Sequence, residues 1–489
     1  MNSENRTSLR VTTVRALKWT SLEVFLRQGL QLLVAIILAR LLGPDDFGTI
    51  ATIYIFTSIA TAFMDGGLST SLIQNQKITI VDESTVFWFN LGIGGLMSLV
   101  LWFIARPISE FYVLPILLPL TKVLAFNVFL SSVGAIHNTI LIKQLRSQVL
   151  MTVGIFSTMA SGVIAIVMAW EGFGVWALAA QTISATTISA IMLWSLSKWR
   201  PYFVFSLKSA KKLLGFGSYM LAATLLDNLY GRLCLLMIGK LYGVRELGLY
   251  NRAESTSGLT SQFLSPIISR IALSTFSIAA YDKVQLRNQM QYAIRGSMLL
   301  NIPAMLGMAA IAEPLIYVLF GEKWIGATLV TQVLCFAGLL SPLHQLNLNV
   351  LMAQGHSKLF FWLDVVKKII GITLLLIGSK FGVMGVAWSL LISGFIAYLI
   401  NTFYTKKFID YGAFSQIRDF LPVLIISLIM SLIVYCINIK LNIYIPIKLI
   451  LLIVIGALIF STLALVFKIV SVRDLYKLIS LNNNSEKFL

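Results

Sequence analysis

The chain has 489 residues, of which 58% are hydrophobic and only 12% are charged, and its formal net charge is +18. Soluble domains carry about 25% charged residues, and single soluble cores stop growing beyond about 250–300 residues, so this composition excludes an ordinary soluble fold. The basic residues are scattered over short segments instead of forming one stripe, which favours a membrane topology signal over nucleic-acid binding. The composition therefore predicts a polytopic membrane protein.

The cysteines and the N-terminal segment indicate no processing or metal chemistry. Cys234, Cys335 and Cys436 lie far apart within apolar segments and in no metal-ligand spacing, so we expect three small buried residues. The first apolar stretch contains Glu23 and Arg27 and lacks a small-residue cleavage site. We therefore expect insertion through this first helix, without removal of a signal peptide.

Fourteen segments are long and apolar enough to cross a bilayer core about 30 Å thick, which requires about 20 helical residues. The predicted spans are 17–42, 47–73, 84–105, 114–141, 148–170, 174–196, 213–241, 247–276, 292–312, 325–353, 359–378, 383–404, 422–439 and 445–470. The eighth, 247–276, is the least apolar. Without it the later basic loops would fall on the opposite side of the membrane from the earlier ones, so the positive-inside rule supports an even count with both termini cytoplasmic.

Two turns of the chain repeat each other at an offset of 200 residues. Arg40–Gly48 and Lys240–Gly248 share a basic residue, Leu, Gly, an acidic residue, an apolar residue and Gly in register. Phe173-Gly174-Val175 and Phe381-Gly382-Val383 form a second, shorter match. These matches indicate duplication of a six-helix unit whose copies insert with the same orientation, related by an axis along the membrane normal.

The repeat predicts the domain organisation. Residues 1–198 form an N-terminal six-helix lobe, residues 199–405 form a second lobe, and residues 406–489 add two helices and a cytoplasmic tail. The expected fold class is thus an all-α membrane protein with about fourteen transmembrane helices. Two such lobes facing a central cavity are typical of alternating access.

The sequence resembles a known family. The turn Arg40–Gly48 is similar to the signature of bacterial polysaccharide transporters, as are Asp65-Gly66-Gly67-Leu68 and Gly174-Val175-Trp176-Ala177. These transporters belong to the multidrug/oligosaccharidyl-lipid/polysaccharide superfamily, which includes O-antigen and colanic-acid-type exporters. The resemblance covers nearly the whole chain and implies two six-helix lobes with two extra C-terminal helices.

The same resemblance implies a function. The protein would be a flippase that moves undecaprenyl-diphosphate-linked oligosaccharide from the cytoplasmic to the periplasmic leaflet of the inner membrane, for surface polysaccharide biosynthesis. The lipid bilayer is its environment, and a polysaccharide polymerase and export machinery are the further partners implied. No motif of the family fixes the sugar, so no sugar-contacting residue is assigned.

Ionisable residues inside the spans are concentrated in the first, second, seventh and eighth spans. Because a charge at mid-membrane is costly, such residues normally face a cavity or a partner. Guanidinium and ammonium groups suit a diphosphate, and carboxylates suit a coupling cation or an arginine partner. The candidates for substrate binding are Arg27, Arg232, Arg252, Arg270 and Lys122, and the candidates for ion coupling or charge pairing are Asp65, Asp227 and Glu254.

Structural interpretations of these charges remain open. Glu23 and Arg27 lie four residues apart and could pair on one helix face. Arg252 lies close to Glu254 in the sequence and could be neutralised by it. Asp227 aligns with Arg27 across the repeat, so the lobes could present opposite charges at matching depth. Asp364, Lys367 and Lys368 are expected to compensate one another. Each alternative predicts pairing within the protein instead of contact with substrate.

The sequence contains no phosphate loop, no zinc-protease motif and no nucleophile elbow, so we expect no enzyme activity, cofactor, metal or nucleic-acid partner. Three rival functions stay open. A lipid II flippase is one variant, which the two extra helices do not exclude. A cation-coupled multidrug antiporter could share the fold, but four intramembrane arginines suit an anionic substrate better. A membrane glycosyl- or acyltransferase could use the same lipid donor.

Overall fold

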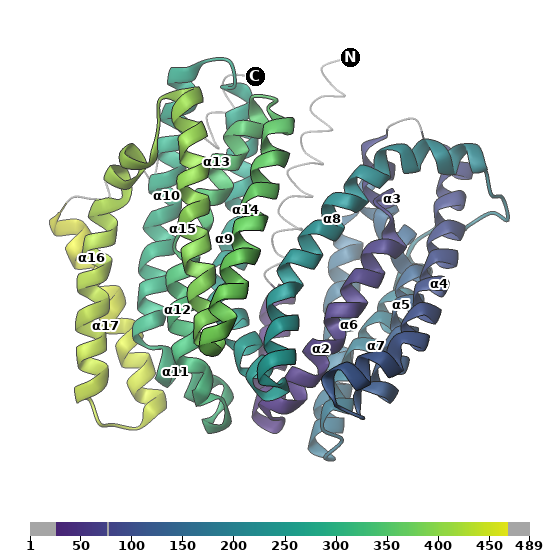
Figure 1. The fold of residues 1–489 in the computed structure, drawn as a ribbon, viewed down its shortest axis with the longest axis horizontal. Coiled ribbons are helices and arrows are strands. Elements are labelled where there is room, and N and C mark those ends of the chain that lie inside the picture. Colours follow the sequence, from purple (N-terminus) through teal and green to yellow (C-terminus); the bar gives the residue numbers. More distant parts are fainter. Residues whose placement is uncertain (1–25, 76–77, 468–489) are drawn as a thin grey trace. The chain divides into compact units, whose positions relative to one another are not determined.

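The computed structural model describes residues 26–75 and 78–467, and at some positions within helices, Arg270 among them, it describes only the backbone. Within these ranges every regular element is a helix (Figure 1). Glu23 lies outside the described residues. The chain divides into two compact units, one ending at Gly248 and the other beginning at Leu249.

In its described part, the first unit contains a helix over 26–41 and seven further helices. These are α2 (Pro44–Asp65), α3 (Leu68–Gln74), α4 (Ile80–Tyr112), α5 (Leu117–Lys143), α6 (Ser147–Trp170), α7 (Val175–Leu196) and α8 (Leu207–Tyr242). Its apolar cores are formed by α2 with α4, α5, α6 and α7, and by α3 with α4, α5 and α8. Because α8 packs against α2, α3 and α4, it belongs to this unit by contact.

The second unit begins within α9 (Val244–Ile278). It continues with α10 (Lys283–Ala310), α11 (Ala312–Phe320), the 3₁₀ turn η1 (Glu322–Ala327), α12 (Thr328–Gly338), α13 (Ser341–Ala353), α14 (Ser357–Gly378), the 3₁₀ turn η2 (Ser379–Phe381), α15 (Gly382–Ile409), α16 (Ala413–Lys440) and α17 (Ile445–Val466). The last two helices pack beside α10 and α11 (Figure 1). The division of the chain by its sequence repeat, into 1–198, 199–405 and 406–489, stays a prediction about the duplication.

The helices confirm the predicted fold class. Ten stretches of the described residues are long and apolar enough to span a membrane, and one of them, Lys358–Ile409, contains both α14 and α15. The eighth predicted span, 247–276, lies within α9, and the polar run that made it the weakest of the fourteen belongs to the first half of this helix. The protein is a multi-pass membrane protein.

Two predicted spans are not single helices. The second, 47–73, breaks at Gly66 and Gly67, both of which have positive φ angles (56° and 69°) that favour glycine. The tenth, 325–353, is divided into η1, α12 and α13. At the break after α12 the Asn301 side-chain Nδ2 donates to the carbonyls of Gly338 (3.2 Å) and Leu339 (3.1 Å). A side-chain donor thus satisfies carbonyls that a broken helix leaves without partners.

A polar contact joins α16 to α10 within the second unit. Arg295 on α10 forms an ion pair with Asp419 on α16, and Asp419 also accepts a hydrogen bond from the hydroxyl of Tyr411. Tyr411 is fully buried in the short connection between α15 and α16. Burial, together with the hydrogen bond to Asp419, raises the pKa of Tyr411 above its ordinary value. The hydroxyl therefore remains a donor at neutral pH.

Candidate functional site

The two repeated turns contact each other at their final glycines. A Cβ on Gly48 would lie 1.7 Å from the carbonyl oxygen of Val244, and a Cβ on Gly248 would lie 1.9 Å from the carbonyl oxygen of Pro44. The contact is reciprocal, because each glycine meets the residue four positions before the other. Only a residue without a side chain allows the two backbones to approach this closely. The residues that match in sequence thus also match in their local environment.

The other residues of the first turn start α2. Gly43 is the N-cap, Pro44 is the first helical residue, and the backbone N–H of Gly43 donates to the Asp46 carboxylate (3.0 Å). Proline fits this position because it needs no N–H partner, and acidic residues stabilise the positive end of a helix. The second turn follows a similar plan, with Gly243 at a positive φ of 87° before α9 and Glu246 in its first turn. The motif therefore encodes a sharp connection and a close crossing.

The helix break in the first unit contains a candidate carboxylate. Asp65 is the last residue of α2, is half-buried, and accepts a hydrogen bond from the hydroxyl of Ser69. Ser69 in turn accepts a hydrogen bond from Thr139 on α5 (3.0 Å). Asp65 therefore ends a relay of two hydroxyls beside an unwound glycine pair. Ser69 and Thr139 were not among the predicted residues, although the Gly66-Gly67 pair in an apolar segment is a signal for such a break.

Three further candidates lie in the first unit. Arg27, near the start of the 26–41 helix, and Arg232 on α8 are half-buried, while Asp227 on α8 is exposed. Arg27 and Asp227 both take part in polar or electrostatic interactions. These residues keep the predicted roles in substrate binding and charge pairing as proposals.

Arg252 has a different environment in the second unit. Its side chain is 7% exposed, and its guanidinium lies 4.7 Å from the ring centroid of Phe320 and 5.1 Å from that of Trp324. Such cation–π contacts stabilise a desolvated guanidinium. This geometry ties α9 to the end of α11 and to η1. Glu254 on the same helix is exposed, and the side chain of Arg270 lies outside the described residues.

Lys122 is half-buried on α5, with its ammonium nitrogen 5.0 Å from the ring centroid of Trp102 on α4. Because Trp102 is itself exposed, this contact lies at the surface of the unit.

The expected charge compensation among Asp364, Lys367 and Lys368 is confirmed. The carboxylate of Asp364 lies 2.6 Å from the ammonium of Lys368 and 3.8 Å from that of Lys367. Those two lysines are held on their own helix, α14.

The cysteine prediction was partly wrong. Cys234 and Cys335 are buried as expected, but Cys436 is exposed on α16. An apolar helix with one face toward lipid exposes small residues as readily as large ones, which composition alone does not reveal. Among the described residues no group of His, Cys, Asp and Glu could hold a metal ion.

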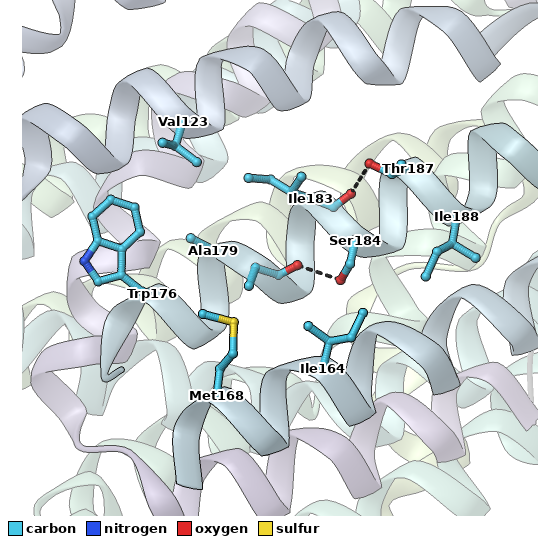
Figure 2. Close-up of a pocket in the computed structure, with 10 residues that line it drawn as sticks. Val123, Ile164, Met168, Trp176, Ala179, Ile183, Ser184, Thr187 and Ile188 are labelled. Carbon is cyan, nitrogen blue, oxygen red and sulfur yellow. Dashed lines mark hydrogen bonds between the residues drawn. The ribbon is translucent and has the colours of Figure 1, made fainter. Parts of the chain in front are cut away.

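An apolar pocket of about 440 Å³ lies between α5, α6 and α7 (Figure 2). Its lining includes Trp176, Met168 and Ile183. The hydroxyls of Ser184 and Thr187 donate to carbonyls of their own helix, at 2.6 and 2.8 Å, as Figure 2 shows. The lining therefore offers hydrocarbon surface and no cationic group, so it suits an apolar chain and not a phosphate.

Comparisons with known proteins agree with this architecture. Residues 37–329 match the family model described as polysaccharide biosynthesis protein, and residues 247–455 match the model of the lipid II flippase MurJ. The chain is 26% identical over 430 residues to the teichuronic acid biosynthesis protein TuaB of Bacillus subtilis (strain 168), covering 86% of this chain and 88% of that protein. It is also 26% identical to the lipopolysaccharide biosynthesis protein WzxC of Escherichia coli (strain K12), with 82% of each chain covered.

Solved structures show the fold. A lipid II flippase MurJ in an inward closed conformation matches with a TM-score of 0.72 at 17% identity, covering 94% of this chain and 99% of that chain. An inward-facing MATE-family multidrug resistance transporter matches with a TM-score of 0.63 at 15% identity, covering 79% of this chain and 98% of that one. At these identities the likeness describes the fold and not the substrate.

Proposed function

The chain belongs to the polysaccharide biosynthesis protein family, and from this we propose that it is a flippase for undecaprenyl-diphosphate-linked oligosaccharide repeat units. One observation carries the proposal. The region that matches the family, residues 37–329, contains both the close contact between the turns of Gly48 and Gly248 and the helix break at Gly66–Gly67. Relatives of similar length are named for the biosynthesis of several different surface polysaccharides. The sugars of these polysaccharides differ, so the part that their lipid-linked precursors could share is the lipid diphosphate.

The proposed path uses the polar groups within apolar helices. Arg27 and Arg232 would bind the diphosphate, since guanidinium groups donate paired hydrogen bonds to phosphate oxygens. Asp65 would bind a coupling cation or proton beside its hydroxyl relay. The lipid tail would remain in the hydrocarbon region. Alternating access would require the close contact of Gly48 with the second turn to open and re-form.

A gradient can drive this movement. With the diphosphate entering from a negative interior, outward transfer is favoured by about 2.3 kcal/mol per charge per 100 mV. We place the protein in the cytoplasmic membrane with both termini cytoplasmic, following the positive-inside distribution of its loops. The proposed role is transport and not catalysis, and a polysaccharide polymerase and export machinery would use the flipped product.

Deletion of the gene tests the proposal. Loss of one surface polysaccharide, with accumulation of a complete diphosphate-linked repeat unit on the cytoplasmic leaflet, is the expected result. An incomplete repeat unit would instead indicate a transferase. Complementation with the intact chain is the matched control, and complementation without recovery would reject a direct role.

One alternative is a cation-coupled multidrug antiporter, which the sequence left open and which would have the same fold. Drug susceptibility of the deletion strain distinguishes the two functions. We expect unchanged efflux of cationic drugs when the cell envelope is intact. Drug accumulation that is reversed by the intact chain, with normal polysaccharide, would favour the antiporter.

A further inference from the structure

The connection between α7 and α8 has a fixed backbone. We define residues 197–212, which are this connection together with the first six residues of α8, as the strap. The indole N–H of Trp88 donates to the carbonyl of Tyr202 (2.9 Å), and the backbone N–H of Tyr202 donates to the hydroxyl of Ser84 (3.1 Å). Farther along, the N–H of Ser206 donates to Thr85 (3.1 Å). Three hydrogen bonds therefore attach an extended segment to the start of α4.

The strap has one apolar side packed inside the unit and another exposed. Trp199 packs toward Phe87 and His137, with ring centroids 6.1 and 5.2 Å apart. By contrast, Phe203 is 92% exposed and Leu207 is 70% exposed. The neighbouring Tyr202, Val204 and Phe205 are exposed as well. An ordered segment thus presents a run of large apolar side chains away from its own protein.

The strap is also strongly basic. Its cationic side chains are all exposed, and no acidic residue lies between 197 and 212; they are Lys198, Arg200, Lys208, Lys211 and Lys212. Lys212 interacts electrostatically with Asp82. Arg200 donates to the carbonyls of Ser197 and Trp199, at 2.6 and 2.7 Å. Lys198, Lys208 and Lys211 remain to bind an external anion, and of these Lys208 and Lys211 lie three residues apart, as neighbours in the first turns of α8.

We propose that the strap is an interfacial anchor that inserts Phe203 and Phe205 at the headgroup boundary of the cytoplasmic leaflet and binds anionic phospholipid through Lys208 and Lys211. Aromatic rings favour the membrane–water interface, and basic segments beside membrane helices bind anionic lipid. Because the exposed charges of the strap are all positive, it should bind an anionic lipid surface in preference to a neutral one. This role goes beyond the proposed flippase activity and does not depend on the identity of its substrate.

The test uses the full-length protein in nanodiscs of phosphatidylcholine, with or without phosphatidylglycerol. In a background of C234A, C335A and C436A, F203C is labelled with an environment-sensitive fluorophore. Quenching by lipids brominated near the headgroup is expected to exceed quenching by aqueous iodide. A label quenched only by iodide would show that residue 203 faces water and would overturn the insertion. A soluble protein partner would then be the other candidate for contact with this segment.

Charge is tested on the unlabelled protein, which needs no cysteine changes. Spin-labelled phosphatidylglycerol should associate preferentially over spin-labelled phosphatidylcholine. K208Q/K211Q should lower this preference, by about fivefold per lysine at the affected lipid sites. K406Q/K407Q removes the same charge from exposed positions at the end of α15 and should have a smaller effect. An equal effect of both pairs, or none from the first, would overturn the proposal.

Discussion

Gly48 and Gly248 occupy equivalent positions in two copies of one sequence motif, and each packs against the backbone of the other copy. A side chain on either residue would overlap a carbonyl oxygen of the opposite turn. The repeat in the sequence is therefore also a repeat in contact geometry. Mutation of either glycine therefore tests the close contact between the two copies of the motif.

Gly48→Ala and Gly248→Ala should each weaken the crossing, because a methyl group placed against backbone cannot be accommodated by a rotamer change. We expect a loss of about 1–3 kcal/mol for each variant, and less than the sum for the double variant because the two sites share one contact. Thermal unfolding in detergent and polysaccharide export give the measurements. Gly92→Ala, where nothing lies within 4 Å, is the control; an equal loss there would contradict the steric explanation.

Arg252→Ala should reduce stability, since it removes a buried cation from two aromatic rings. The expected cost is about 2 kcal/mol, the upper range for desolvated cation–π contacts. Measurement of folded protein in membranes separates this effect from transport activity. Arg245→Ala, which changes an exposed arginine about two helix turns earlier on α9, should have little effect. Full folding of Arg252→Ala with lost export would instead support substrate contact.

Arg27 and Asp227 provide a test of the proposed charge pairing between repeats. Arg27→Asp and Asp227→Arg should each lower export at least several-fold. If the two charges compensate each other, the double variant should recover part of the activity. Export is measured at matched membrane abundance. A double variant as inactive as either single one, with normal folding, would count against pairing and leave separate roles for the two residues.

Asp65→Asn should keep a hydrogen-bond acceptor for Ser69 while removing the negative charge. We therefore expect normal abundance with reduced export if the carboxylate binds a coupling cation. The dependence of export on an imposed proton or sodium gradient is the measurement, and Ser69→Ala tests the relay separately. Unchanged gradient dependence in Asp65→Asn would exclude this carboxylate from coupling.

Tyr411 predicts a pH effect on stability. Burial and the hydrogen bond to Asp419 raise its pKa in the folded protein above the unfolded value of about 10. Its contribution is therefore fully present below the unfolded pKa and is lost as pH rises through the folded one. Tyr411→Phe should cost about 1.5–3 kcal/mol at neutral pH and show a smaller further loss at alkaline pH. Parallel alkaline unfolding curves of both proteins would refute this linkage.

Much of the architecture follows from the sequence because hydropathy and length are sufficient to locate apolar helices in a bilayer. The predicted span 148–170 corresponds to α6 (Ser147–Trp170), and 174–196 to α7 (Val175–Leu196). Helix breaks were missed, because Gly66 and Leu339 lie inside segments whose average hydropathy remains high. Hydropathy records how apolar a segment is and not whether its backbone stays helical.

The candidate site was only partly accessible to sequence reasoning. Intramembrane charge identifies residues that need an explanation, but it cannot distinguish a ligand site from an internal contact. The aromatic neighbours of Arg252 come from α11 and η1, more than 60 residues away along the chain. The hydroxyl relay from Asp65 likewise depends on Thr139 from another helix. Such pairings arise from tertiary packing.

The amide of Asn301 has a consequence for the hydration of the helix break. At a break in a transmembrane helix, two carbonyls without partners would attract water into the low-dielectric interior. Asn301 takes the place of that water with two hydrogen bonds. The chain can therefore change direction between α12 and α13 without leaving these two carbonyls unpaired.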